Sequence, residues 1–433
     1  MTICSKRARN RETTRILLVG NHTCGNRGDA AIVRGLVTHL EFLLPDAEIV
    51  VTSRYPVSSA FLLGRPVIPD VMERWFEDTR PLLPARVGAK CRRDLVPIVL
   101  GLATHPKWRW LRHLLPPGIT RQIEWLTDFD IVIQVGGSFF VDLYGYRQFE
   151  TPFAAIIAER PLLLLGHSMG PFGSKTYRFL AAQLLRRASI VSLRESVSYE
   201  LLVRDGLPTH RVTNGSDTAW LVPNDGPAPR WLLTLPNGRP LVGITLRELA
   251  PFDKRLNISQ EQYEKGFAVL ADQLIDKGFE VIACSTCTGI DSYHRDDRMV
   301  ALRVKSRVHQ RKHFHVVMNE LNDVELGLLF REFRILIGTR LHSAIIAMNF
   351  GTPAISLNYE HKSAGILAQL GLPELAAPVS SIVDGSLLRK VEGLLSDLPS
   401  VRSRVRVGVE RERQKALQML SDAIASLVPS KKR

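Results

Sequence analysis

The sequence predicts an α/β protein of two doubly wound, Rossmann-like domains that face a cleft. Short apolar runs alternate with segments of helical periodicity, most of these runs end in glycine-rich or polar loops, and one proline-rich stretch divides the series in two. The chain has 433 residues, a length for which two cores are more natural than one.

The first β-α-β unit opens this series. Residues 15–20, RILLVG, form an apolar run, and residues 21–28 are rich in turn-forming types. Apolar residues then recur at helical spacing over residues 32–44, and EIVVTSR returns to a strand pattern. We therefore predict a helix that begins at Asp29 between two parallel strands.

Further strand candidates follow in both halves. Each is an apolar run before a polar or glycine-rich loop, which is typical of a buried parallel sheet covered by helices. They are DIVIQVGGSFF, PLLLLGHSMGPF and SIVSLRES in the first half, and LVGITLRE, FEVIACST, FHVVM, RILIGTR and PAISLNYE in the second.

The proline-rich stretch sets the expected domain boundaries. It reads VPNDGPAPRWLLTLPNGRP, a composition typical of a linker. We expect a basic tail over residues 1–13, a first domain over 14–222, a linker over 223–240, a second domain over 241–397, and a helix with a frayed tail over 398–433.

Composition restricts the class of protein. Apolar residues make up 45% and charged residues 23%, as in globular proteins, and no apolar run reaches the roughly 18 residues of a membrane helix.

The five cysteines are few and odd in number, which favours reduced thiols. Cys284 and Cys287 form a C-x-x-C motif, but the second pair of cysteines that a zinc site needs does not occur. We expect a cytoplasmic protein that is not secreted.

The net charge of +14 favours an anionic partner. Nucleic acid, anionic lipid and a phosphorylated metabolite all fit the charge, but no zinc-finger spacing or RNA-binding aromatic signature occurs, and we expect no nucleic acid. Residues 105–118 place two tryptophans among basic residues. This pattern is typical of a peripheral membrane face, and equally of an amphipathic helix packed on its own domain.

Charged residues also interrupt the apolar region 338–366. RILIGTR predicts a strand and LHSAIIAMNFG a helix, so Arg340 and His342 would stand at a helix N-terminus. Free amides, the helix dipole and a guanidinium fork attract carboxylate or phosphate there. The alternative is an arginine paired with a structural carboxylate and a histidine that caps a turn. A second charged cluster follows the next strand: Glu360, His361 and Lys362.

A series of motifs runs through nearly the whole chain, from about Arg15 to the last helix. They are GNHTCGNRGDAAI, QVGGSFFVDLYG, GHSMGPF, LRESVS, SDTAWL and GTRLHSAIIAMNFGTPAISLNYEHKSAGI, together with ITLRELAPFDKRL and STCTGIDSYHRDDRMVAL. In this order they resemble the bacterial polysaccharide pyruvyl transferases, most closely the colanic-acid and amylovoran biosynthesis type. The resemblance implies a GT-B-like fold, phosphoenolpyruvate as donor, and no metal or cofactor.

The resemblance also implies which residues hold the donor. Arg340, Leu341 and His342 match an Arg-Leu-His triplet that binds phosphoenolpyruvate, and Arg194 in LRES is the candidate for a separate donor arginine. His167 in GHSMGP is the candidate for a further donor contact. Arginine suits this task because it stays charged and its planar fork matches carboxylate and phosphate oxygens.

The product that the resemblance implies is a pyruvate ketal that bridges two sugar hydroxyls, and ketal formation requires at least one acid and one base. His342 is the candidate acid, or else binds phosphate as an imidazolium. Three carboxylates at loop ends are candidate proton acceptors: Asp29, Glu195 and Asp217. Each carboxylate has a structural alternative. Asp29 could serve merely as the cap of its helix, Glu195 could pair with Arg194, and Asp217 could form an Asx turn.

The expected acceptor is a sugar, here a terminal galactose, on a lipid-linked exopolysaccharide repeat unit. Its candidate contacts are Asn21, Asn26, Glu360, His361 and Lys362. Such an acceptor would be met at the cytoplasmic leaflet of the inner membrane, where residues 105–118 would touch anionic lipid. A GT-B glycosyltransferase that uses a nucleotide sugar and a non-catalytic polyanion-binding protein are the alternatives. The sequence leaves the oligomeric state open.

Overall fold

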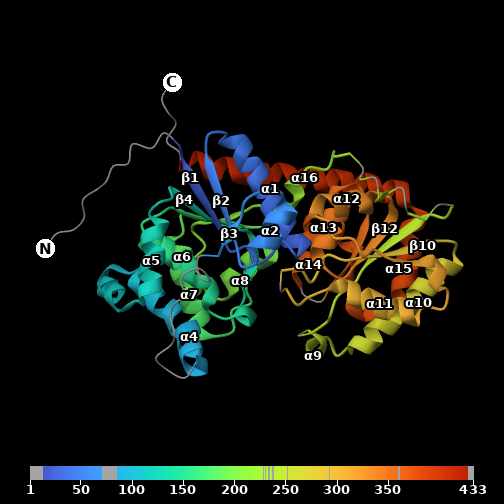
Figure 1. Cartoon of the computed structure of the whole chain (residues 1–433), viewed down its shortest axis with the longest axis horizontal. Coiled ribbons are helices and arrows are strands. Elements are labelled where there is room, and N and C mark those ends of the chain that lie inside the picture. Colours follow the sequence, from blue (N-terminus) through green and yellow to red (C-terminus); the bar gives the residue numbers. More distant parts are fainter. Residues whose placement is uncertain are drawn as a thin grey trace.

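The chain folds into two halves, each built on one parallel sheet with helices packed around it (Figure 1). The computed structural model describes residues 13–70 and 85–427 without 228, 230, 233–234, 237, 251, 292 and 359–360, and it describes no side chains at 85–93 and 361–363. The predicted fold class, two Rossmann-like α/β domains, is confirmed.

The first sheet contains eight strands in the described part of the chain, all paired in parallel. Their order is β3-β2-β1-β4-β6-β7-β8, and β5 also pairs with β6. They are β1 (Arg15–Val19), β2 (Glu48–Ser53), β3 (Ile68–Pro69), β4 (Ile131–Gln134), β5 (Gly137–Phe140), β6 (Leu162–Met169), β7 (Ile190–Leu193) and β8 (Val212–Asn214).

The second sheet contains six parallel strands in the described residues, in the order β11-β10-β9-β12-β13-β14. They are β9 (Leu241–Thr245), β10 (Glu280–Cys284), β11 (Phe314–Val316), β12 (Phe333–Gly338), β13 (Ala354–Asn358) and β14 (Ala376–Pro378). Both sheets reverse their winding direction beside the first strand, between β1 and β4 and between β9 and β12. Ligands of open α/β sheets bind at such switch points, beyond the carboxyl ends of the strands.

The described helices connect these strands. Those of the first half are α1 (Arg27–Leu43), α2 (Pro56–Leu63), α4 (Ala85–Ala103), α5 (Pro117–Leu126), α6 (Glu150–Ile157), α7 (Lys175–Arg187), α8 (Ser196–Arg204) and the 3-10 helices η1 (Pro106–Leu114), η2 (Asp142–Tyr144), η3 (Arg147–Phe149) and η4 (Thr218–Leu221). Those of the second half are α9 (Asp253–Leu256), α10 (Gln260–Asp276), α11 (Asp297–Arg307), α12 (Asp323–Arg331), α13 (Leu341–Asn349), α14 (His361–Gln369), α15 (Ser386–Ser396), α16 (Leu398–Ala425) and the 3-10 helices η6 (Arg311–His313), η7 (Pro373–Leu375) and η8 (Val379–Ile382).

Two of the predicted elements differ in detail from the structure. The first helix begins at Arg27 rather than Asp29, because the side chain of Asn26 accepts a hydrogen bond from the Gly28 amide and caps it. The run DIVIQVGGSFF forms β4 and β5 instead of one strand, since Gly137 has a φ of 134° that breaks the extended course. The short strands β3, β8 and β14 have too few residues for periodicity to reveal them.

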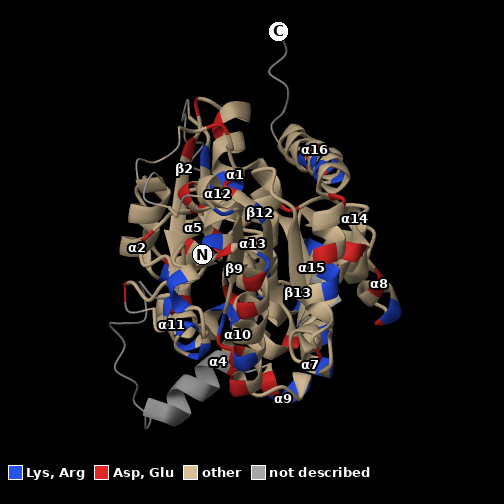
Figure 2. Ribbon diagram, turned by 90° about the vertical axis from the view of Figure 1, so that its right-hand side faces the viewer, with Lys and Arg blue, Asp and Glu red and all other residues tan. Residues whose placement is uncertain are grey.

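The last long helix joins the two halves. After the segment 223–240 the chain enters the second sheet, and α16 then returns along the outside of both halves (Figures 1 and 2). It packs against α13 and α15 of the second half and against α1, β6 and η4 of the first. The Arg413 guanidinium donates to the carbonyl of Trp220 and to the side chain of Asn349, and so contacts both halves at once.

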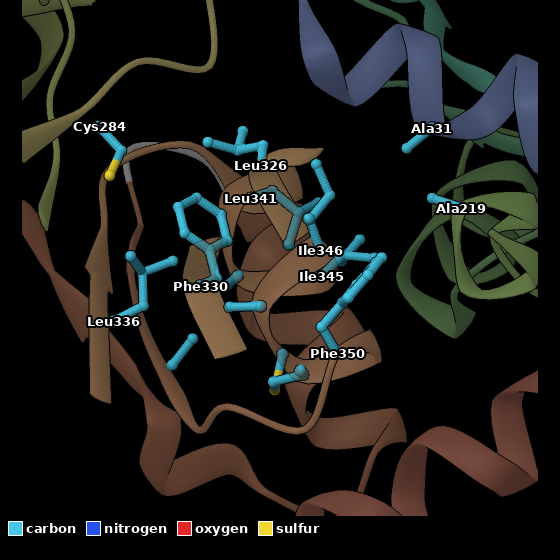
Figure 3. Close-up of a cluster of buried hydrophobic side chains, with 14 of the residues drawn as sticks. Ala31, Ala219, Cys284, Leu326, Phe330, Leu336, Leu341, Ile345, Ile346 and Phe350 are labelled. Carbon is cyan, nitrogen blue, oxygen red and sulfur yellow. The ribbon is translucent and has the colours of Figure 1, made fainter. Parts of the chain in front are cut away.

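The two halves share a continuous apolar core where α1 meets α13. Ala31 of α1 and Ala219 of η4 face Leu341, Ile345 and other apolar residues of α13 (Figure 3). Charged contacts lie beside this core. Arg34 of α1 pairs with Asp323 of α12 at 2.8 Å, and the buried Arg27 pairs with Glu320. These contacts hold the two halves together at the base of the cleft between them.

Gly35 provides a test of this packing, because α1 approaches η4 closely there. A Cβ at position 35 would lie 1.9 Å from the carbonyl oxygen of Thr218. We expect Gly35→Ala to lower the free energy of unfolding by about 1–3 kcal/mol in a chemical denaturation experiment, since overpacking forces the elements apart. Gly393→Ala is the matched control: it also lies in a helix, α15, but a Cβ there meets nothing within 4 Å. It should leave stability unchanged or raise it by up to about 1 kcal/mol. Equal stability of both variants would contradict the close approach of α1 to η4.

Candidate active-site cleft

A cleft of about 670 Å³ lies between the halves, at the switch points of both sheets. Its wall in the first half follows strand ends, with Gly20 after β1, Gln134 at the end of β4 and Arg194 after β7. Thr286 follows β10 and Arg340 follows β12 in the wall of the second half. The carboxyl ends of both sheets thus converge on one space.

Arg194 is held rigidly in the wall of the first half. It is 3% exposed, and all three of its side-chain nitrogens have partners. Nη1 donates to Asp217 Oδ2 at 2.6 Å, Nε to Ser168 Oγ at 2.8 Å, and Nη2 to Ser138 Oγ at 2.9 Å. A guanidinium fixed in this way needs no reordering when an anion binds beside it.

Asp217 links this arginine to the second half. Its Oδ1 accepts from the Ala219 amide at 2.9 Å and caps η4, while its Oδ2 accepts from Arg194 and lies 3.2 Å from His342 Nε2. Burial alone would raise the pKa of Asp217, but Arg194 and His342 outweigh it and hold this pKa well below its usual range. Asp217 stays ionised and does not line the cleft, so it positions its two partners.

His342 lies in the first turn of α13 and reaches across to the first half. Besides Asp217, its Nε2 lies 3.4 Å from Arg194 Nη1. The imidazole also lies against the start of α1, where a Cβ at Gly28 would come within 2.7 Å of the ring. Only glycine at position 28 leaves room for this ring, and the ionised Asp217 favours a proton on Nε2.

Arg340 occupies the N-cap position of α13 in the opposite wall. Its Nε and Nη2 donate to the two carboxylate oxygens of Asp297 at 3.0 and 2.9 Å, a bidentate pair with the first turn of α11. Asp297 is itself fixed, because it accepts from the Cys287 amide at 3.0 Å. Arg194 and Arg340 come from different halves and line the same cleft.

Asp29 lines the cleft from the first turn of α1. Burial raises the pKa of Asp29 to about 6, while the charges of His342 and the two cleft arginines act in the opposite direction. The carboxyl can therefore gain and lose a proton close to neutral pH. This property suits a group that exchanges protons with a substrate.

Besides Asp217, two more of the predicted site residues do not reach the cleft. Glu195 is the N-cap of α8, where it accepts from the amide of Ser198 at 2.8 Å and from the Ser198 hydroxyl. His167 has no exposed surface, and its Nε2 lies 3.2 Å from the carbonyl oxygen of Gln134. Burial lowers the pKa of His167 to about 4, so the ring is neutral. The structure therefore places Glu195 at a helix cap and His167 behind the cleft wall, and it brings neither side chain into the lining of the cleft.

The predicted acceptor contacts are placed unevenly. Asn21 and Asn26 line the cleft, as does Leu341 of the predicted donor triplet; the amide Oδ1 of Asn21 is buried and has no hydrogen-bond partner among the described residues. Glu360 lies outside the described residues. His361 and Lys362 begin α14, which packs against α8 of the first half, but their side chains are not described.

Sequence reasoning missed several residues of the cleft. Four further arginines line it: Arg54, Arg147, Arg247 and Arg295. His22 of the first half and Tyr293 of the second form an edge-on ring contact with centroids 5.8 Å apart at its border. The motifs ITLRELAPFDKRL and STCTGIDSYHRDDRMVAL contained Arg247, Tyr293 and Arg295, but no spacing rule singled these residues out.

Comparison with solved structures shows the same architecture at low sequence identity. Anabaena HepE in complex with UDP and glucose matches with a TM-score of 0.59 and 13% identity, over 96% of this chain and 100% of that one. A UDP-GlcNAc 2-epimerase from Neisseria meningitidis bound to UDP-GlcNAc matches with a TM-score of 0.57 and 12% identity, over 95% of this chain and 100% of that one. These likenesses show a GT-B-like fold and nothing further.

Comparison of sequences is more specific. The amylovoran biosynthesis protein AmsJ of Erwinia amylovora is 43% identical over 419 residues, which cover 95% of this chain and 100% of AmsJ. The family model for polysaccharide pyruvyl transferase matches residues 26–361, a range that includes Arg194, Asp217 and the Arg340–His342 triplet. The chain belongs to the polysaccharide pyruvyl transferase family.

Proposed function

We propose that this protein transfers the pyruvate unit of phosphoenolpyruvate to a sugar of a lipid-linked exopolysaccharide repeat unit and forms a cyclic ketal. The acceptor sugar in this proposal is a terminal galactose. The observation that carries the proposal is the convergence of Arg194 and Arg340, from different halves, on one cleft. Family membership and the amylovoran biosynthesis relative support the class of reaction.

The charge of the cleft fits a donor with two anionic groups. Among the described residues that line it, six are arginines and two are aspartates. Phosphoenolpyruvate carries a carboxylate and a phosphate, and guanidinium forks match the oxygens of both. Asp217 and Asp297 hold Arg194 and Arg340 in fixed orientations, so little ordering entropy is lost when the donor binds.

The reaction moves three protons around one carbon. The methylene carbon of the donor gains a proton, and one sugar hydroxyl attacks the adjacent carbon and loses its proton to a base. The bond from this carbon to the phosphate oxygen then breaks, and the second hydroxyl closes the ketal and gives its proton to the phosphate, which leaves as hydrogen phosphate. We assign the first proton to His342, which Asp217 orients, and the hydroxyl proton to Asp29. The cleft arginines stabilise the phosphate as its charge develops.

The exposed segment η1 supports a peripheral membrane contact within this proposal. None of its residues is buried, and Trp108, Trp110 and Leu114 are 46%, 54% and 65% exposed. Arg109 pairs with Glu159, which precedes β6, so η1 lies near the amino ends of the strands, whereas the cleft lies at their carboxyl ends. Among the described residues, no helix is long and apolar enough to cross a bilayer. We propose that η1 rests on anionic lipid of the cytoplasmic leaflet, with the cleft left open to the glycan.

Incubation with phosphoenolpyruvate and a lipid-linked oligosaccharide that ends in galactose tests the activity. We expect the mass gain of a pyruvate ketal and release of an equal amount of inorganic phosphate.

Arg340→Lys keeps the charge but removes the fork, so kcat/KM should fall by about tenfold or more. The control is Arg204→Lys. Arg204 pairs with Asp205 at the surface, where its side chain is 62% exposed, so this variant should turn over normally. Thermal protection by a UDP-sugar but not by phosphoenolpyruvate would instead indicate a sugar transferase.

The pH dependence tests the role of Asp29. Because its pKa is raised to about 6 and the base must be ionised, kcat/KM should fall as the pH decreases through about 6. Asp29→Asn should lose roughly a hundredfold or more in activity and this acidic limb. The same raised pKa means that ionised Asp29 destabilises the fold above pH 6 and that this cost vanishes as the pH falls towards 4.

Thermal unfolding provides the matching stability measurement. Asp29→Asn should unfold at a higher temperature than wild type at pH 7.5, and the difference should shrink at pH 4.5. The control Asp422→Asn changes an exposed aspartate on α16 and should show neither effect. An active Asp29→Asn variant would remove Asp29 from the chemistry.

Flotation with lipid vesicles tests the membrane contact. Binding to vesicles that contain phosphatidylglycerol should decrease with added salt and should be lost in a Trp108→Ser, Trp110→Ser double variant. Phe42→Ser, at a side chain that is 81% exposed, is the control for loss of an exposed aromatic residue elsewhere. Absence of salt-sensitive flotation in the wild type would contradict the proposed membrane contact and would not affect the proposed enzymatic activity.

A further inference from the structure

A second groove lies at the far end of α13, away from the cleft. Its volume is about 940 Å³. The C-terminal end of α13, the start of β12, the end of α15 and the first half of α16 form its walls, and Asn224 contributes from the segment between the halves. The Arg340–His342 triplet stands at the other end of the same helix, so this groove is separate from the proposed active site.

The groove is strongly cationic. Four arginines line it, Arg334, Arg402, Arg406 and Arg413, against one carboxylate, Glu410. Glu410 lies 3.9 Å from Arg413, and no carboxylate of the described residues forms an ion pair with the other three arginines. Figure 2 shows Lys and Arg along α16, seen from the side of the second half. Such an excess of like charge in a concave space favours binding of an anion.

One of these arginines has an unused donor. Arg402 Nη2 donates to the carbonyl of Phe333 at 3.3 Å, but its Nε is shielded from solvent and has no hydrogen-bond partner among the described residues. A buried donor without an acceptor costs free energy. The Nη1 of Arg402 also has no hydrogen-bond partner among the described residues and is not shielded in this way, so an anion in the groove can bond to it. The first turn of α16, with Leu398 and Pro399, lines the same space and brings the positive end of the helix dipole.

The floor of the groove is apolar. Met348, Phe350, Leu398 and Val409 line it and are between 1% and 8% exposed overall. A bare inorganic ion would leave this floor uncovered. A volume of about 940 Å³ lies within the usual range of small-molecule sites, which combine apolar walls with a few placed polar groups.

We propose that this groove is a binding site for an organic diphosphate, whose oxygens pair with Arg402 and Arg406 and whose carbon portion covers Phe350 and Leu398. Arg334 borders the same anion from the start of β12. Arg413 is already engaged with Trp220 and Asn349 and forms the inner wall. The proposal stands independently of the reaction in the cleft. Soluble nucleotides and lipid diphosphates share this chemistry.

Titration calorimetry with inorganic pyrophosphate on the full chain is the first test. The double variant Arg402→Gln, Arg406→Gln should weaken the binding event of the groove by about tenfold or more. The matched control Arg404→Gln, Arg411→Gln removes two arginines of the same helix that bond elsewhere, Arg404 to Glu374 and Arg411 to the carbonyl of Gln369. It should bind as the wild type does. Equal affinity of the two double variants would overturn the proposal.

Hydrogen–deuterium exchange separates this groove from the cleft. Pyrophosphate should protect amides in residues 348–351 and 395–409, and this protection should disappear in the Arg402→Gln, Arg406→Gln variant. Protection confined to cleft segments such as 194–198 and 338–342 would overturn the proposal, because the ion would then bind only in the cleft.

Two organic probes identify the source of the ligand. ADP represents a soluble nucleotide and geranyl diphosphate represents a lipid diphosphate. Tighter binding of either probe than of pyrophosphate, lost in the groove variant, supports the proposal and selects the source. If neither binds more tightly than pyrophosphate, the apolar floor contributes nothing and the groove is not a site for an organic diphosphate.

Discussion

The contact between Asp217, Arg194 and His342 is the interaction on which the cleft depends. It joins three places that are distant in sequence: the end of β7, the cap of η4 and the first turn of α13. Arg194 and Asp217 are each about 2% exposed in their side chains, so the pair is removed from water and each charge needs the other. Removal of either partner would leave an uncompensated buried charge and release His342.

Close packing of the two halves makes this contact possible. The start of α1 can lie against His342 only because residue 28 is glycine, and α1 can approach η4 only because residue 35 is glycine. Arg27 spans the same border with a guanidinium that donates to the carbonyl of Gly25 and to Thr288 Oγ1. These contacts fix the position of one half relative to the other beside the cleft. If the halves moved apart by more than small amounts, the buried polar contacts would have to break.

Much of the fold and part of the site were predictable. Apolar runs and loop composition located the principal strands, and the pattern around Arg340 correctly placed this residue after a strand and before a helix, where it lines the cleft. His167 lies near the end of β6 and Glu195 follows β7, yet their side chains point into the wall and to a helix cap. A residue's place near the end of a strand does not fix the direction of its side chain, which depends on neighbours from distant elements.

The sequence by itself determined the doubly wound architecture, the division into two halves and the cationic character of the molecule, because periodicity, turn chemistry and charge are local or summed properties. The tertiary structure decided which arginines share a space, that Asp217 lies behind the cleft wall in contact with Arg194 and His342, and that burial raises the pKa of Asp29 to about 6. It also placed four arginines around a second groove that no motif marks. Burial and the distance between charges set these properties, and both arise only when segments hundreds of residues apart pack together.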